Sequence, residues 1–207
     1  MDTQLVSKVR RKIAGWYTVP GQLDKAVARI MAQRYEIVEL LRSTGREGIE
    51  NVIQYLDESG FYYRASSANG HHNFPGGLAE HSLGTFRIAE KNAGPEVPRD
   101  SVIIAALLHD ICKSDRFWFR GRTINKHRQT GIGRLHSARS IAILRDCGVK
   151  LTTAERRAIR WHMGKLKRYI RNEAAAADRA QALKEPLWHA VYFADKEDAS
   201  HHPAQRH

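Results

Sequence analysis

The most apolar run of the chain is Ser101-Val-Ile-Ile-Ala-Ala-Leu-Leu-His-Asp-Ile-Cys-Lys113, and two polar residues, His109 and Asp110, stand near its end. The run predicts a buried helix. Burying an imidazole and a carboxylate without partners costs several kcal/mol, so these two groups need something that compensates them. A metal ion compensates both at once. The run therefore predicts a metal site at the end of a core helix.

The composition indicates one globular domain. The chain has 207 residues, of which 42% are apolar, and this is enough to bury a core. Its two cysteines, Cys112 and Cys147, are too few for a disulfide framework and indicate a reducing compartment. No apolar stretch is long enough to span a membrane, and the first residues lack the basic-then-apolar order of a secretion signal. We therefore expect a cytoplasmic protein without a membrane partner.

The net charge is strongly positive. Lys and Arg number 34 against 22 Asp and Glu, which gives a formal charge of +12. Such a surface attracts phosphate-rich partners by long-range steering and counterion release. The alternative is a solvated basic face that binds nothing. We favour a phosphorylated substrate, with nucleic acid as a further candidate.

Helical periodicity is common along the chain, and strand signals are scarce. Asp100 is the expected N-cap of the helix that leads to His109, and Thr152-Thr-Ala-Glu155 forms a capping box for a later one. The connector Arg116–Gly133 is expected to hold a small hairpin around Gly121. The other helices are expected over residues 23–41, 49–56, 78–92, 136–146, 152–163 and 186–200. The fold class is therefore all-α, a single compact helical bundle.

Metal-ligand residue types recur on the apolar faces of five of these helices. Taken singly, each is more often a hydrogen-bonded core residue than a ligand. Their recurrence on five helices favours one shared site. These residues are His81, His109 with Asp110, His136, His162 and Asp195.

These residue types suit hydrolysis of a phosphoester. Imidazole and carboxylate bind first-row divalent ions, and a carboxylate can bridge two of them. A metal ion of this kind activates water for attack on phosphorus. Lys113 follows Asp110 by three residues, one helical turn on, where its ammonium group can neutralise a phosphate oxygen. The alternative for Lys113 is an ordinary surface lysine.

Six short motifs surround the candidate ligands or precede them in the sequence. They are Thr44-Gly-Arg-Glu-Gly-Ile-Glu50, His71-His-Asn-Phe-Pro-Gly-Gly77, Gly76-Gly-Leu-Ala-Glu-His-Ser82, Ala106-Leu-Leu-His-Asp-Ile-Cys-Lys113, Ile159-Arg-Trp-His-Met-Gly164 and Ala194-Asp-Lys-Glu-Asp198. Together they resemble the HD-domain superfamily of metal-dependent phosphohydrolases. The resemblance is to small bacterial and phage HD hydrolases and to the HD domain of a bacterial 3′–5′ exoribonuclease, and it covers roughly Gly45 to Ser200.

The resemblance implies a domain organisation and a first metal site. The HD-type domain is expected over residues 45–200, preceded by a helical extension over 1–44 and followed by a polar tail over 201–207. One cation is expected, and Mn, Fe, Co, Ni or Zn suits the ligands, with Mg as a further candidate. Its implied ligands are His81, His109, Asp110 and Asp195.

The resemblance also implies a second metal site in some members. There Asp110 bridges two ions, and His136 and His162 contribute to the second. This chain departs from the fullest pattern at Met163, where many members carry a second consecutive histidine. A thioether is a poor ligand for a hard or borderline cation. His127 competes with His136 for its role, so the choice between one and two ions stays open.

Other residues indicate how a substrate is bound. The run Arg116-Phe-Trp-Phe-Arg-Gly-Arg122 interleaves aromatic and basic side chains, a mixture that stacks bases and follows a phosphate backbone. Arg160 lies close to His162 in the sequence. His71 and His72 precede the Gly-Gly turn and are candidates for substrate contacts, with a simple loop role as the alternative.

The leading hypothesis is a metal-dependent phosphohydrolase that cleaves a phosphomonoester or phosphodiester in a nucleotide-like substrate. Asp110 and Lys113 are its expected catalytic residues, and Lys113, His71, His72 and Arg160 its expected substrate-binding residues. One alternative is a single-strand 3′–5′ exonuclease, favoured by the basic surface. The other is a non-catalytic, metal-containing nucleotide-binding module. The oligomeric state is left open.

Overall fold

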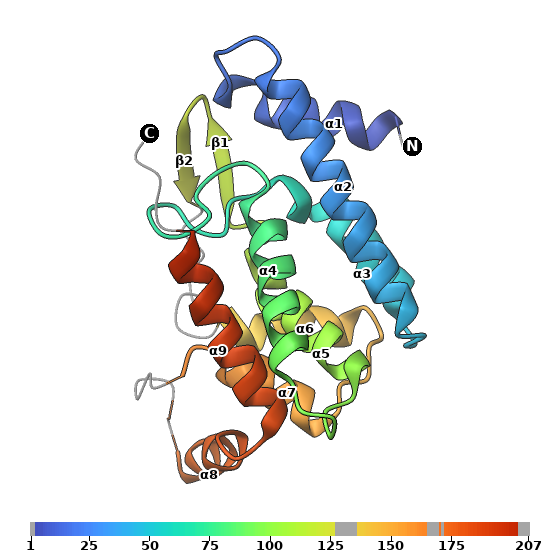
Figure 1. Ribbon diagram of the computed structural model, residues 1–207, viewed down its shortest axis with the longest axis vertical. Coiled ribbons are helices and arrows are strands. Elements are labelled where there is room, and N and C mark those ends of the chain that lie inside the picture. Colours follow the sequence, from blue (N-terminus) through green and yellow to red (C-terminus); the bar gives the residue numbers. More distant parts are fainter. Residues whose placement is uncertain (1–2, 127–135, 165–169, 171, 203–207) are drawn as a thin grey trace.

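A computed structural model of the chain describes residues 3–126, 136–164, 170 and 172–202. These residues form helices and one small two-stranded sheet, so the predicted all-α class is confirmed (Figure 1). The α-helices are α1 (Thr3–Ile13), α2 (Gln22–Ser43), α3 (Ile49–Ser59), α4 (Gly77–Asn92), α5 (Arg99–Leu108), α6 (His136–Asp146), α7 (Thr153–Trp161), α8 (Glu173–Ala182) and α9 (Pro186–His201).

Helix α4 lies in the middle of the molecule. Figure 1 shows it between α9 on one side and α2 with α3 on the other, and it packs along both α9 and α5. Helix α5 is buried on every side, from Ser101 to Leu108, because α2, α4, α7 and α9 all contact it. This is why its sequence is a continuous apolar run rather than an amphipathic pattern.

The end of α5 places the two polar residues that interrupt this run. The helix ends at Leu108 with His109 as its C-cap, and Asp110 precedes a short 3₁₀ helix, Ile111–Lys113. His109 and Asp110 are therefore buried at a helix end, where the chain changes direction, and not within a helix. Their side chains lie close to polar groups of α4, α6 and α9 and to His162, the C-cap of α7.

The predicted helix caps have mixed outcomes. Thr152 and Glu155 form the expected capping box: Thr152 Oγ1 accepts from the Glu155 amide at 3.2 Å, and Glu155 Oε2 accepts from the Thr152 amide at 2.8 Å. Asp100 is not the N-cap of α5. Pro98 holds that position, and Asp100 lies in the first helical turn. There its carboxylate still favours the positive end of the helix dipole.

The expected hairpin is present. Strands β1 (Phe117–Arg120) and β2 (Thr123–Lys126) pair antiparallel around Gly121, which has a positive φ of 55°. No helix in the described part of the chain is long and apolar enough to cross a membrane. The predicted division into 1–44, 45–200 and 201–207 stays a proposal.

Candidate metal centre

Three of the predicted ligands converge from three parts of the fold. His81 projects from α4, His109 caps α5, and Asp195 projects from α9; all three are buried. Nε2 of His81 lies 3.2 Å from Oδ1 of Asp195, and Nε2 of His109 lies 3.9 Å from the same oxygen. These atoms surround one point, as the ligands of a cation would.

Asp110 lies between this group and two further histidines. Its Oδ2 is 3.3 Å from Nε2 of His109 and 3.9 Å from Nε2 of His81. Its Oδ1 faces the other way, 3.4 Å from Nε2 of His136 and 3.7 Å from Nε2 of His162. The two oxygens of one carboxylate thus face two separate pairs of imidazoles, the arrangement of a bridging ligand.

Backbone carbonyls fix the orientation of two of the rings. Nδ1 of His109 donates to the carbonyl of Ala106 at 2.8 Å, and Nδ1 of His162 donates to that of Ile159 at 2.7 Å. A carbonyl only accepts, so each Nδ1 carries the proton and each Nε2 presents a lone pair to the centre. Histidines that bind a metal through one ring nitrogen usually donate the other N–H to an acceptor of this kind.

The buried polar atoms at the centre fit a divalent cation. Nε2 of His81, Nε2 of His109 and Oδ1 of Asp110 are inaccessible to solvent and have no well-formed hydrogen bond. Unpaired buried polar atoms are costly and rare, and a cation would satisfy all three. Metal–ligand bonds of about 2.0–2.2 Å place neighbouring ligand atoms roughly 3–3.5 Å apart. The separations between Nε2 and carboxylate oxygens here run from 3.2 to 3.9 Å, so small shifts would bring the atoms to that spacing.

The charges at the centre compensate one another. Nζ of Lys113 lies 2.6 Å from Oδ2 of Asp110. Burial alone would raise the pKa of Asp110, but Lys113 and His109 outweigh it and hold this pKa well below its usual range. Burial alone would lower the pKa of His81, yet the neighbouring carboxylates of Asp195 and Asp198 raise it to about 9, so a cation at Nε2 would have to displace a proton. Burial lowers the pKa of His162 to about 3, so this imidazole is neutral and free to coordinate.

A pocket of about 500 Å³ opens onto this centre. The candidate ligands Asp110, His136, His162 and Asp195 line its inner end. Its remaining wall is mixed: Ala68, Phe117, Met163 and Ala199 lie among polar and basic residues. The polar and basic residues of that wall are Ser66, Ser67, Asn69, His71, Lys113, Arg116, Lys126 and Lys196.

A comparison with protein-family models identifies the family of this chain. The family model of the HD domain matches residues 78–199, from the start of α4 to the end of α9. The chain belongs to the HD-domain family. The resemblance drawn from the motifs is therefore confirmed, and the matched segment contains all six predicted metal ligands.

A curated relative matches a short segment of the chain. The chain is 47% identical over 55 residues to the dihydroneopterin 2′,3′-cyclic phosphate phosphodiesterase of Methanocaldococcus jannaschii. That match covers 23% of this chain and 22% of the length of the archaeal enzyme. No solved structure matches the chain.

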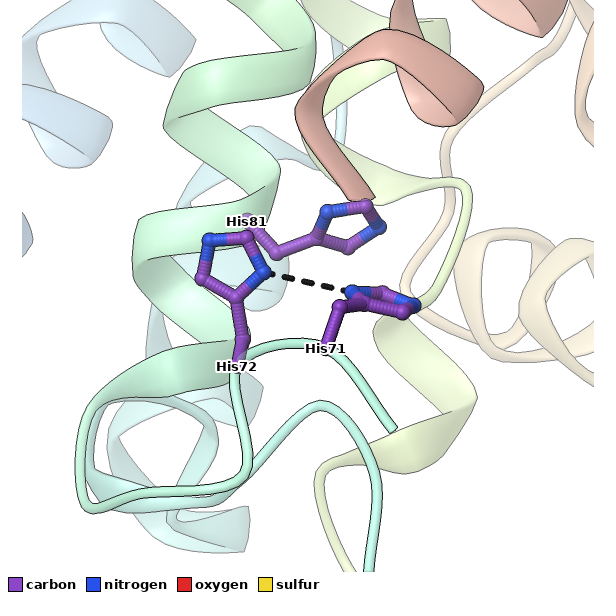
Figure 2. A group of neighbouring side chains, drawn as sticks. All are labelled: His71, His72 and His81. Carbon is purple, nitrogen blue, oxygen red and sulfur yellow. Dashed lines mark hydrogen bonds between the residues drawn. The ribbon is translucent and has the colours of Figure 1, made fainter. Parts of the chain in front are cut away.

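The HD-domain fold brings all six predicted metal ligands together, but it separates the predicted substrate contacts. Lys113 and His71 line the pocket. His72 does not line it. This residue is fully buried, its Nδ1 lies 3.2 Å from Nδ1 of His71, and Figure 2 shows both rings beside His81.

Arg160 is also absent from the pocket wall, and its guanidinium lies 5.2 Å from the centre of the Trp161 ring. His127, the rival of His136, falls outside the described residues.

Sequence reasoning missed several residues of this HD-domain site. Lys126 and Lys196 line the pocket, and Asp198 accepts a hydrogen bond from Nδ1 of His81 at 2.6 Å. A signal for Asp198 was present, because it follows Asp195 by three residues and shares its helix face. The sequence contains no comparable signal for Lys126, because its position at the pocket depends on where the hairpin lies in the folded protein.

Proposed function

We propose that this chain is a metal-dependent phosphohydrolase that cleaves a phosphomonoester or phosphodiester bond in a nucleotide-like substrate. One observation carries the proposal: the carboxylate of Asp110 faces two pairs of buried imidazoles at the inner end of a basic pocket. Hydrolysis of phosphoesters needs a positive centre that a phosphoryl oxygen and a water molecule can both reach. A buried cluster lacking the adjoining pocket would suit a structural ion instead.

Six residues of the chain would hold the metal ions. His81, His109, Asp110 and Asp195 would hold the first cation, and Asp110 would share a second with His136 and His162. A bound divalent cation supplies the positive charge that polarises the phosphoryl group and makes water a nucleophile at neutral pH. Asp110, His136 and His162 would give that second cation three protein ligands, since Met163 adds none, and this would leave room for substrate and water.

Lys113 is placed to act on the phosphoryl group. Its ammonium lies 2.6 Å from Asp110 and also faces the pocket. Burial alone would lower its pKa, but Asp110 raises it, so Lys113 stays protonated. A fixed positive charge next to the reacting phosphorus stabilises the negative charge that develops there.

The rest of the pocket suits a small anionic substrate. Arg116, Lys126 and Lys196 add positive charge around its wall, and Oγ of Ser66 is buried there without a hydrogen-bond partner. A volume of about 500 Å³ falls within the roughly 300–1,000 Å³ of sites for single small ligands. The similarity to a cyclic phosphate phosphodiesterase favours a cyclic phosphodiester of a heterocyclic compound. These features favour a mononucleotide-sized substrate over a long single strand.

We place the enzyme in the cytoplasm, since Cys112 and Cys147 are both free thiols. Its metal is a first-row divalent ion, and Mn, Fe, Co, Ni and Zn all suit a site of imidazoles and carboxylates. Mg prefers oxygen ligands and suits this set less well.

The test is a hydrolysis screen on protein stripped with chelator and reloaded with each of these ions. The substrates are 2′,3′-cyclic and 3′,5′-cyclic nucleotides, nucleoside monophosphates and short single-stranded oligonucleotides. We expect metal-dependent turnover of a mononucleotide-sized ester, and we expect Asp110→Ala to abolish it together with metal binding. Stepwise shortening of oligonucleotides alone would support the exonuclease. Full metal content without turnover of any phosphoester would support the non-catalytic module and contradict the proposal.

A further inference from the structure

Two carboxylates of one helix lie close to the two nitrogens of a single imidazole, that of His81. Asp195 and Asp198 lie three residues apart in α9 and face the same side of that helix. Oδ1 of Asp195 is 3.2 Å from Nε2 of His81, and Oδ2 of Asp198 is 2.6 Å from Nδ1 of the same ring. The ring is therefore held between α4 and α9, the helices that pack most extensively against each other.

Helix α4 is built to admit the Asp198 carboxylate. Gly84 follows His81 by one helical turn, and a Cβ at position 84 would lie 1.9 Å from Oδ1 of Asp198. Any other residue would push the carboxylate away from His81. Glycine inside a helix is unfavourable relative to alanine, so its presence in the middle of α4 has a local structural reason. That reason is the space occupied by Asp198.

The surroundings of Asp198 are buried and polar. Its side chain is 4% exposed, and Nε2 of His72 lies 3.6 Å from its Oδ2. His72 has a positive φ of 50°, which is unusual for a residue other than glycine, and its ring stands beside that of His81 in Figure 2. On the outer side, Nδ1 of His202 lies 3.8 Å from Oδ1 of Asp198. Asp198 thus lies behind the metal centre, away from the pocket.

We propose that Asp198 is a positioning residue for the metal centre, and that Gly84 is the residue that gives it room. By accepting the Nδ1 proton of His81, Asp198 fixes the ring orientation and the tautomer in which Nε2 points at the cation. Partners of this kind on metal-binding histidines typically contribute 10- to 100-fold to metal affinity. The inference rests on the proposed metal centre, but it needs neither substrate nor turnover.

The test measures the dissociation constants of Zn²⁺ and Co²⁺ by competition with a chelator on the full chain. We expect Asp198→Ala to weaken binding by 10- to 100-fold, and Asp198→Asn, which keeps an acceptor oxygen, to weaken it less. Glu197→Gln is the matched control, since it removes a negative charge from an exposed position of the same helix and should leave affinity unchanged. In the Zn²⁺-loaded wild type, ¹H–¹⁵N spectra should show His81 protonated at Nδ1, and this signal should be lost in Asp198→Ala.

Substitution of Gly84 provides a second, independent test of the role of Asp198. Gly84→Ala should weaken metal binding in the wild type although alanine favours the helix. In the Asp198→Ala background the same change should have no further effect on affinity, because the group it displaces is already gone.

Two results would overturn the inference. One is wild-type affinity in Asp198→Ala with only a lower melting temperature, which would make Asp198 merely structural. The other is the loss of one bound ion with unchanged affinity for the rest, which would make Asp198 a direct ligand together with His72 and His202. Absence of phosphoester hydrolysis in the wild type would contradict the proposed function and leave this inference intact.

Discussion

At the scale of single residues, the site depends on where each proton is held. Backbone carbonyls fix Nδ1 of His109 and His162, and Asp198 does the same for His81. The metal-ligand residue types were recognisable in the sequence because imidazoles and carboxylates on apolar helix faces need a compensating partner. Their hydrogen-bond partners were not recognisable, since Ala106 and Ile159 contribute only backbone carbonyls that every residue has.

Lys113 is the residue whose role is easiest to separate from metal binding. We expect Lys113→Met to lower kcat by roughly 10²- to 10³-fold, as removal of a fixed charge or donor at a reacting centre does. The metal content should remain at the wild-type level, because the ammonium group competes with the cation for Asp110. Steady-state kinetics and elemental analysis of the same preparation check this. Unchanged kcat would contradict this role and leave Lys113 only as the partner that balances the charge of Asp110.

At the scale of elements, apolar periodicity predicted most of the helices that carry the site. The helix at 136–146 has the expected bounds, and the last helix ends at His201, one residue beyond the expected end. Helix α8 could not be predicted in this way, because it is rich in alanine and buries almost none of its residues. The contact between α4 and α9 could not be predicted either, since helical periodicity shows which face is buried but not which helix covers it.

One buried side chain joins three elements, and its loss should be costly. Glu155 caps α7, accepts from Oγ of Ser101 on α5 at 2.7 Å, and pairs with Arg46 in the loop before α3. We expect Glu155→Ala to lower the free energy of unfolding by about 3 kcal/mol, because it removes the cap and leaves buried partners unsatisfied. Urea denaturation measures this.

The matched control for that change is Glu173→Ala. Glu173 is also a glutamate in the first turn of a helix, but it is exposed. It should cost under about 1 kcal/mol. Equal losses in the two variants would contradict the role given to the buried network.

At the scale of the whole molecule, the fold joins parts of the chain that are far apart in sequence. The ligands span 115 positions, from His81 to Asp195, and they meet because α4 and α9 pack side by side around the end of α5 (Figure 1). The apolar run and its terminal His109–Asp110 pair were enough to predict that such a centre exists. The basic wall of the pocket, with Lys126 from the hairpin and Lys196 from α9, required the assembled fold.

The central claim is that this buried cluster holds divalent cations through Asp110. Elemental analysis per chain, after loading with Mn²⁺, Co²⁺ or Zn²⁺ and removal of excess ion, tests it most directly. We expect one to two tightly bound ions in the wild type and none in Asp110→Asn that remains folded. Wild-type protein that binds none of these ions, or Asp110→Asn that keeps the full complement, would contradict it.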